Sequence, residues 1–468
     1  MASVNSVEAW EHSKNDLTSS SWTASDWETK VFSMLKFSYD QLTDETHRKC
    51  FLYCALCPED HQIPVHHLIY QWIGEGFLYN EMMTSVHDMC CHGGSVIEKL
   101  KHSCLLEKVE RSIKMHDVIR DMTPWIARDQ DKNKRKVIVQ EDAWPMSQAN
   151  VEDRGKVETI SISIMNDAKS YIQSIVWTNL TTLILNFGDA YKINGLHNIQ
   201  YAKRLKVLEL GVQRRSRIQT VARIPVEIVG LNCLEYLSLD RLFFPGSEIS
   251  RELMKLKNLK VFILHIPGGD VVPLGLIRNL QQLKVFRFLD IAADTNVDGR
   301  DEKEFVEGLE RSSILEELWM GIRTGSGLNQ LCKSAKLPSC MHSLIVSNVY
   351  AQINGPLLLA TLSKMKLLQR LEFLDLNNVI DPSAFDTLLE LLDFPNLRSI
   401  CKRFLSFPSL RSVEVLRCPN LKKLPFDSSS AKAKLRLIKG SQVWWNNLEW
   451  DDTAVEVTFQ SKFQAYTY

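Results

Sequence analysis

An aliphatic pattern, L-x-x-L-x-L or a relaxed version of it, recurs eleven times between Val157 and Leu437 and constrains the fold more than any other feature of this chain. In each copy the last two apolar residues are two apart, so on a strand they share one face, while the first belongs to the turn that leads into the strand. One face of every strand is therefore expected to be core. The clearest copies are Leu205/Leu208/Leu210, Leu234/Leu237/Leu239, Leu259/Phe262/Leu264, Leu283/Phe286/Phe288, Leu315/Leu318/Met320 and Leu371/Leu374/Leu376, and weaker ones begin at Val157, Leu180, Met341, Leu410 and Leu435.

The copies are spaced like the units of a solenoid. The anchors Leu205, Leu234, Leu259 and Leu283 are 29, 25 and 24 residues apart, which matches the roughly 20–29-residue period of leucine-rich repeats. A single repeat cannot bury its own aliphatic ridge, whereas stacked repeats bury it for one another and leave a broad concave strand surface suited to binding. We therefore predict a leucine-rich-repeat α/β solenoid over residues 157–440.

Composition restricts the partners and the compartment. The 468 residues are 45% hydrophobic and 24% charged, and a formal net charge of zero gives no general attraction to DNA, RNA or an anionic membrane. The N-terminus has no basic start followed by an apolar stretch, and no apolar run approaches the length of a membrane span. Eleven cysteines without a regular framework fit a reducing compartment. These features predict a cytoplasmic protein without a membrane span.

Residues 26–128 lack the repeat and have the pattern of a small helical domain. Apolar residues at helical spacing predict a first helix around residues 31–42, and Thr43 is expected to cap a second one. A one-sided apolar stripe over 65–73 predicts a third helix, which Gly74 and Gly76 would end. Alternation over 105–109 and 113–115 predicts a short hairpin. Three helices and a hairpin are the parts of a winged helix, so the whole chain is predicted to be an α+β multi-domain protein.

A winged helix raises the question of DNA binding. A recognition helix needs lysine or arginine to contact phosphates and guanine edges, yet residues 58–80 contain neither and carry Glu59, Asp60 and Glu75. The sequence therefore favours a structural or regulatory module over a DNA reader.

Several segments also resemble a known family. In chain order they are LKFSYDQL (35–42), CFLYCALCPED (50–60), WIGEGFL (72–78), KMHDVIRDM (114–122), RCPNLKKLP (417–425) and WWNNLEW (444–450). Ahead of and within leucine-rich repeats, these segments resemble plant nucleotide-binding leucine-rich-repeat disease-resistance proteins of the coiled-coil class. The resemblance covers nearly the whole chain.

The resemblance implies a cytosolic immune receptor that holds ADP at rest and exchanges it for ATP when a pathogen cue reaches the repeats. In that family the Met-His-Asp triplet, here Met115, His116 and Asp117, is the ADP-sensing motif, and its histidine contacts the phosphate. A histidine at a helix start suits this role because the adjacent N–H groups carry partial positive charge toward an anion. The alternative is that Asp117 only caps the helix over 118–128.

The sequence also departs from the family. No G-x-x-x-x-G-K-[ST] occurs, and the nearest fragment, Gly155-Lys156-Val157, lacks the serine or threonine and the glycine loop. The stretch WEHSKNDLTSS at 10–20 resembles the segment after the family's glycine-leucine-proline motif, so residues 1–25 are expected to be a remnant of the preceding helical domain. We therefore expect an N-terminally truncated receptor, with an incomplete ADP site and no cofactor of its own.

Three further segments have predicted roles. Pro124, inside the helix expected from 117, should kink it or end it early, because an interior proline removes one backbone hydrogen bond. The charged run DQDKNKRK opens a predicted linker over 129–156. Trp444, Trp445, Leu448 and Trp450 are the expected lid of the last repeat, within a tryptophan-rich cap over 441–468.

Two groups of cysteines and histidines invite a metal. Cys54-x-x-Cys57 is followed by His61 and His66, but the cysteines are expected on a helix without the loop of a zinc finger, so buried thiols are the preferred interpretation. His87, Cys90, Cys91 and His92 are crowded, but Gly93 and Gly94 suggest a loop. We therefore predict no metal site. No G-x-S-x-G elbow is present either, so we do not predict an enzyme.

The strand residues that point away from the core are the candidate partner contacts. They include Ile184, Glu209, Ser238, Ile263, Arg287, Trp319, Ile345, Asp375 and Glu414, flanked by Tyr236, Val261, Glu317 and Phe373. Aromatic residues and arginine are favoured anchors of protein interfaces, so we predict protein contact through Tyr236, Arg287, Glu317, Trp319, Phe373 and Asp375. The partner implied by the resemblance is a pathogen effector or a guarded host protein. The alternatives are that this face packs against the nucleotide-binding domain of the receptor, as autoinhibition would require, or that it contacts only solvent.

The sequence leaves other functions open. The chain could be completed by a full-length receptor partner and keep ADP sensing, or it could be a leucine-rich-repeat adaptor with no signalling role. An adaptor of the ubiquitin-ligase kind would need an N-terminal F-box, whereas residues 1–60 match the receptor motifs.

Overall fold

The computed structural model describes residues 24–466 except for 58–60, 81–82, 110–111, 130–135, 142–156, 165–176, 188–189, 213–224, 241, 243–252, 254, 266–279, 289–298, 348–356, 358–360, 362–363, 366, 368–369, 375–389, 393–411, 418, 420, 425, 427–434 and 451. The side chains of strands β4, β13 and β14 also lie outside the description.

The N-terminal part is the predicted winged helix. Its β1, β3 and β2 form an antiparallel sheet in that order, in which Ile113 of β3 pairs with Ile63 of β1 and with Lys108 of β2. The predicted hairpin is confirmed. The elements are α2 (Ala24–Asp40), α3 (Glu45–Cys54), β1 (Ile63–Pro64), α4 (Val65–Glu75), α5 (Val86–His102), β2 (Glu107–Val109), β3 (Ser112–Lys114) and α6 (Asp117–Asp129).

The bounds of these helices correct two predictions and part of a third. The cap of α3 is Asp44, whose carboxylate accepts the N–H of Thr46 at 2.7 Å, and not Thr43. Gly93 and Gly94 lie inside α5 and not in a loop. At Gly93 the helices α4 and α5 approach so closely that a Cβ would lie 2.9 Å from Ile69 Cγ1. Helix α6 does not end early at Pro124 but continues to Asp129, and a kink there stays a prediction.

The predicted third helix is confirmed as α4. Its C-cap is Gly76, with φ of 80°, a left-handed conformation that glycine adopts without a Cβ clash. Trp72 and Tyr70 of α4 are fully buried.

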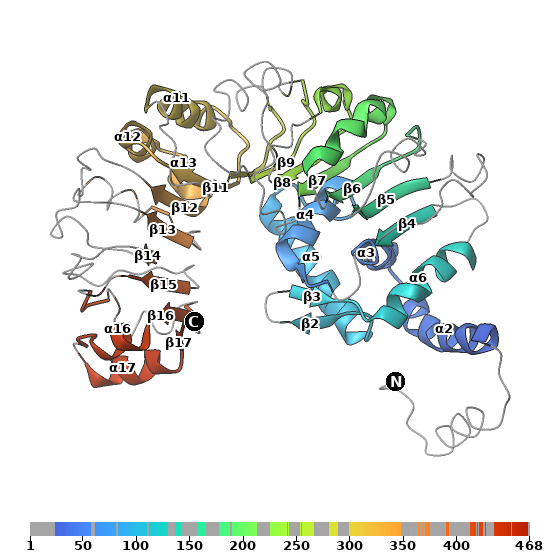
Figure 1. Cartoon of the computed structure of the whole chain (residues 1–468), viewed down its shortest axis with the longest axis horizontal. Coiled ribbons are helices and arrows are strands. Elements are labelled where there is room, and N and C mark those ends of the chain that lie inside the picture. The colour runs from blue at the N-terminus through green and yellow to red at the C-terminus, as the bar shows by residue number, and fades with distance from the viewer. Residues whose placement is uncertain are drawn as a thin grey trace.

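The remaining strands form one parallel sheet, in which the described strands run in chain order from β4 to β17. Figure 1 shows the sheet bent into an arc, with its strands on the inside and α11, α12 and α13 on the outside. This is the predicted solenoid. Its strands are β4 (Lys136–Glu141), β5 (Val157–Ile164), β6 (Thr182–Phe187), β7 (Val207–Val212), β8 (Tyr236–Asp240), β9 (Val261–His265), β10 (Val285–Phe288), β11 (Glu317–Ile322), β12 (Met341–Ser347), β13 (Arg370–Leu374), β14 (Glu390–Leu392), β15 (Ser412–Leu416), β16 (Leu437–Gly440) and β17 (Phe463–Ala465).

Helices and 3-10 turns complete the repeats and the C-terminal end. They are η2 (Ala190–Tyr201), η3 (Val226–Gly230), α11 (Gly299–Glu310), α12 (Gly325–Lys333), α13 (Leu337–Cys340), α16 (Gln442–Asn446) and α17 (Thr453–Gln460).

The aliphatic ridge is the core of the solenoid. The three apolar residues of each clear copy from Leu205 to Met320 are at most 9% exposed and belong to one continuous cluster. The copy that begins at Leu371 falls where side chains are not described. Shared burial along the ridge explains why the repeats stack, because no repeat covers this surface alone.

The two ends of the sheet are formed differently from each other. At the first end β4, within the range expected as a linker, pairs with β5 and contacts α6. At the last end the cap adds the strand β17 beside β16. There Trp444 and Trp445 are 4% exposed, and the Trp445 ring stacks on Phe463 with centroids 4.2 Å apart. The tryptophans therefore close the last repeat, as predicted.

Candidate functional site

Helix α4 of the winged helix lies on the concave face of the repeats. It contacts β7 and β8, and Figure 1 shows the blue helices of the winged helix inside the arc beside the green strands. One apolar cluster is continuous across the two domains. It joins the winged-helix core to Ile184, Val207, Tyr236, Val261, Ile263 and Val285 of the repeats.

A glycine permits this close contact. A Cβ on Gly74 would lie 2.5 Å from the Cβ of Tyr236, closer than carbon atoms can pack. Gly74 therefore serves the approach of α4 to β8 and lies inside the helix, one residue before its end.

Glu209 of β7 is the polar centre of the contact. Its Oε2 lies 2.9 Å from Nε2 of His67 and accepts a hydrogen bond from Nε2 of Gln71 at 2.8 Å. His67 and Gln71 are one turn apart on α4, so both reach the same carboxylate. Burial alone would lower the pKa of His67, but the Glu209 carboxylate outweighs it and raises that pKa. Burial alone would raise the pKa of Glu209, but His67 and the other donors lower it. The pair is therefore held in its charged form.

A second polar group lies at the far edge of the contact, on β10 and β11. The hydroxyl of Tyr70 donates to Oε1 of Glu317, and Nε1 of Trp319 donates to the same oxygen at 2.8 Å. The guanidinium carbon of Arg287 lies 3.9 Å from the centroid of the Trp319 ring and 5.8 Å from that of Tyr70. Burial raises the pKa of Tyr70 well above its usual value, so the tyrosine acts as a neutral donor to the carboxylate.

A ladder of charged residues, each directly before a strand, forms a seam beside α4. Lys284 pairs with Glu316 at 2.7 Å and also donates to the carbonyl of Thr84. The other Glu316 oxygen accepts the N–H of Val86, at the start of α5, at 2.6 Å. At the opposite end of α4 the hydroxyl of Thr182 donates to Glu75. Polar side chains of the repeats thus contact the winged helix at both ends of the interface.

The predicted partner residues divide between this contact and the surface beyond it. Tyr236 is fully buried and Glu317 is 7% exposed, so in this arrangement both contact the chain's own winged helix. Arg287 and Trp319 are partly exposed. Phe373 lies on β13, where side chains are not described, and Asp375 lies outside the described residues.

The register of the strands lines up the predicted face. Ile184, Glu209, Ser238, Ile263, Arg287 and Trp319 are successive partners in one row across β6 to β11. A register shift between Leu318 and Trp319 then brings Ser343 opposite Trp319 and Ile345 opposite Gly321. Leu344 and Val346 belong to the core cluster and Ile345 does not, so Ile345 lies on the predicted face but two residues beyond this row. An extra residue of this kind cannot be read from the repeat pattern.

The Met-His-Asp triplet lies at the start of α6. Met115 is 7% exposed, whereas His116 is exposed. Nδ1 of His116 accepts the N–H of Val118 at 3.3 Å, so the histidine, and not Asp117, supplies the cap contact. Oδ1 of Asp117 is buried and has no hydrogen-bond partner among the described residues. A buried carboxylate oxygen attracts a hydrogen-bond donor and repels a phosphate. Within the triplet and the start of α6, only His116 and the backbone N–H groups therefore suit an anion.

The two cysteine and histidine groups have separate places. Cys54 is buried at the end of α3, where burial raises its pKa well above the usual value, and Cys57 follows in the next turn. Cys91 Sγ lies 3.7 Å from Nε2 of His87 on the surface of α5. Among the described residues, no three His, Cys, Asp or Glu side chains are placed to hold a metal ion. Within the same residues, no helix combines the length and apolarity needed to cross a bilayer.

The sequence pattern does not predict the winged-helix side of the contact, which His67, Tyr70 and Gln71 provide. Gln71 is a polar residue that is only 3% exposed. The available signal was Glu209 and Glu317, acids within apolar strands, because buried carboxylates require donors from elsewhere.

Comparison with known proteins agrees with this architecture. A family model described as the disease resistance protein winged helix domain matches residues 56–123. Disease resistance protein RPS5 of Arabidopsis thaliana is 27% identical over 540 residues, which cover 98% of this chain and 58% of the relative. Disease resistance protein UNI of the same plant is 27% identical over 532 residues, which cover 100% and 59%. The chain thus spans somewhat more than half the length of these relatives.

A solved internalin from Listeria monocytogenes is 12% identical, and the match covers 66% of this chain and 78% of the internalin chain with a TM-score of 0.30. The fold is assigned from the winged helix and from the register of the parallel strands. The chain contains the winged-helix domain of disease resistance proteins, followed by a parallel-strand solenoid, and is similar over nearly its whole length to Arabidopsis disease resistance proteins.

Proposed function

We propose that this chain is the recognition and regulatory part of a plant intracellular immune receptor and acts by binding proteins, without catalysis. The similarity to disease resistance proteins supports the defence role. We also propose that the protein is located in the cytoplasm, because its scattered free cysteines fit a reducing compartment.

The observation that carries the proposal is the docking of α4 on β6 to β11. The winged helix occupies the concave face that a solenoid ordinarily offers to a partner. In Figure 1 strands β12 to β17 form the other arm of the arc, away from the winged helix. A partner that binds that arm meets Trp319 and Arg287 at the boundary, and these side chains contact Glu317 and Tyr70 of the docked interface. Trp319 and Arg287 would then contact a bound partner and also support the docked winged helix.

The triplet at α6 has a part in the proposal. His116 is exposed at a helix start, where an N–H end and an imidazole suit a phosphate. We propose that it supplies one contact to ADP, and that the remaining contacts come from residues other than those of this chain.

The proposal is tested by proximity labelling in leaves. The full chain, fused to a biotin ligase, is expressed in leaves with and without pathogen challenge, beside the variants Trp319→Ala and Val443→Ala. Val443 is 72% exposed on the C-terminal cap and serves as the control. We expect challenge to add labelled proteins that Trp319→Ala loses and Val443→Ala keeps. Identical labelling by all three chains would contradict recognition through the concave face.

A further inference from the structure

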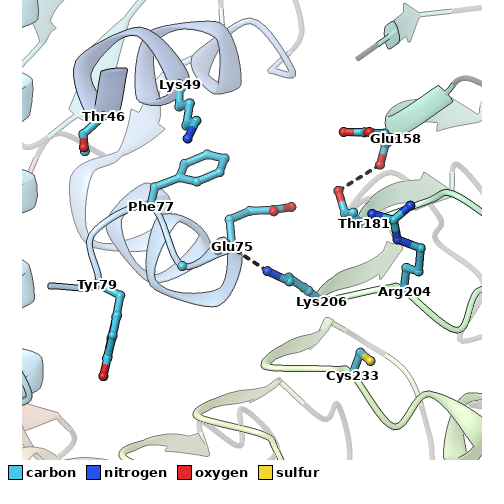
Figure 2. A pocket seen from close by; sticks show the side chains of 11 residues that line it. Thr46, Lys49, Glu75, Phe77, Tyr79, Glu158, Thr181, Arg204, Lys206 and Cys233 are labelled. Carbon is cyan, nitrogen blue, oxygen red and sulfur yellow. Dashed lines mark hydrogen bonds between the residues drawn. The ribbon is translucent and has the colours of Figure 1, made fainter. Parts of the chain in front are cut away.

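A cavity of about 540 Å³ lies at the first end of the seam between the winged helix and the repeats. Residues of α3, the end of α4 and the turn after it form one side of it, while Glu158 of β5 and the residues before β6, β7 and β8 form the other, as Figure 2 shows. Its volume lies within the range of about 300–1,000 Å³ that is typical of small-molecule sites. The cavity is separate from the Met-His-Asp triplet and from the contacts around Glu209.

Three cations from both domains line the cavity: Lys49 of α3, and Arg204 and Lys206 of the turn before β7. Lys49 lies 3.9 Å from an exposed glutamate, Glu45. Arg204 donates to an amide oxygen, that of Asn179, at 3.3 Å. The cavity thus collects positive charge that the residues beside Lys49 and Arg204 neutralise only weakly.

Lys206 differs from the lysines at the same position of later repeats. Lys260 and Lys284, each directly before a strand, have a glutamate oxygen at 2.6 Å and 2.7 Å respectively. The Lys206 ammonium donates instead to the backbone carbonyl of Glu75 at 3.5 Å, a long bond to a neutral group. The ladder therefore directs one cation into the cavity.

Two carboxylates also line the cavity, so its net charge is one positive. The Glu75 carboxylate already accepts the Thr182 hydroxyl. The backbone carbonyl of Glu158 accepts the hydroxyl and the N–H of Thr181, which fixes that wall. A ligand group with two negative charges gains from three cations at once.

An aromatic ring completes the site. Phe77 is half-buried, and in Figure 2 its ring lies between Lys49 and Glu75, facing the opening. Tyr79 follows two residues later and also lines the cavity. An aromatic ring of a ligand can pack on Phe77, because aromatic pairs in offset-stacked or edge-to-face arrangements attract one another.

We propose that this cavity binds a small phosphate monoester with an aromatic body, whose phosphate contacts Lys49, Arg204 and Lys206 and whose ring packs on Phe77. Because Lys49 belongs to the winged helix and Lys206 to the repeats, the ligand ties the two domains together. The site goes beyond the proposed protein recognition and does not depend on it.

The test uses phenyl phosphate and the full chain. Titration calorimetry is expected to give a dissociation constant of about 1 mM or below, at least tenfold tighter than for inorganic phosphate or benzyl alcohol. The double variant Lys49→Gln, Lys206→Gln should weaken binding at least tenfold, and Arg204→Gln, at an exposed position, should weaken it severalfold without affecting the fold. Lys422→Gln, at an exposed lysine that does not line the cavity, should bind as the wild type does.

Cys233 provides a second readout of the location. Its thiol is exposed and lines the cavity, whereas Cys91 and Cys104 are exposed elsewhere. At ten times the dissociation constant about a tenth of the sites remain open, so alkylation of Cys233 by iodoacetamide should slow about tenfold while Cys91 and Cys104 react unchanged. Absence of binding at millimolar phenyl phosphate, equal affinity of the double variant, or an unprotected Cys233 would overturn the proposal.

Discussion

The sharpest prediction concerns Glu209, the carboxylate that holds α4 to β7. In Glu209→Ala the chain loses the contact to His67 at 2.9 Å and the hydrogen bond from Gln71 at 2.8 Å. The side chains of His67 and Glu209 are 29% and 15% exposed, so water screens the pair only partly. Both contacts go to the charged carboxylate, and a hydrogen bond to a charged group contributes about 1.5–3 kcal/mol, with values near the lower end where water screens it. We expect docking to weaken by about 2–4 kcal/mol.

Thermal unfolding measures this loss. For a domain of about 100 residues, 1 kcal/mol shifts Tm by about 4–8 °C, so the first unfolding midpoint of Glu209→Ala should fall by about 10 °C or more. The control is Glu227→Ala, which removes another His–Glu pair of 2.8 Å, with His197, on the surface. His197 is 75% exposed, and exposed pairs contribute about 0–1 kcal/mol.

The same pair predicts a pH dependence. The pKa of His67 is raised above 6.5, so its contribution is complete below pH 6.5 and is lost as pH rises through the raised value. The pKa of Glu209 is lowered below 4.5, so its contribution is complete above pH 4.5 and is lost as pH falls through the lowered value. The docked state should therefore be most stable between about pH 4.5 and 6.5. Equal midpoints for Glu209→Ala and Glu227→Ala, or an unchanged slope above pH 6.5 in Glu209→Ala, would refute this reasoning.

Three further predictions concern packing. Gly93→Ala should lower the free energy of unfolding by about 1–3 kcal/mol, because the new Cβ would lie 2.9 Å from Ile69. The new Cβ of Gly94→Ala would meet nothing within 4 Å, so this variant should raise the free energy of unfolding by about 0.5–1 kcal/mol. Urea unfolding measures both shifts, and equal shifts would contradict the close approach of α4 and α5. Trp445→Ala should destabilise the last repeats by about 3–5 kcal/mol, and calorimetry showing an unaltered final transition would contradict its role in the cap. Pro124→Ala should raise the melting temperature of the winged helix, because α6 continues past the proline; an unchanged midpoint would show that the missing hydrogen bond has no cost there.

The repeat ridge could be predicted because it follows a local rule. Residues two apart on a strand share a face, so Leu208 and Leu210 had to point the same way, and stacking then buried them. The same rule predicts the faces of the row from Ile184 to Trp319, and of Ile345. It does not predict that Ser343 lies opposite Trp319, because a register shift depends on how two neighbouring strands meet and leaves no mark in the spacing.

The site was predicted less completely because it joins residues far apart in the chain. Pattern alone placed Tyr236 on the concave face, but not that α4 would cover it. Gly93 suggests a loop by its propensity, since glycine disfavours helix interiors, whereas close packing against α4 places it inside α5. Only tertiary packing distinguishes a glycine that ends a helix, such as Gly76, from one that admits a neighbour.

The docked winged helix also limits how a partner can act. Val207, Tyr236, Val261 and Val285 lie in adjacent strands, and none has measurable exposure while α4 is in place. Removing α4 would expose them as one apolar patch together with the Glu209 carboxylate, and large exposed patches of this kind promote association. A partner that displaces the winged helix must therefore cover this patch or leave it available to another surface. Either outcome makes release of α4 a change in the surface that the repeats offer for binding.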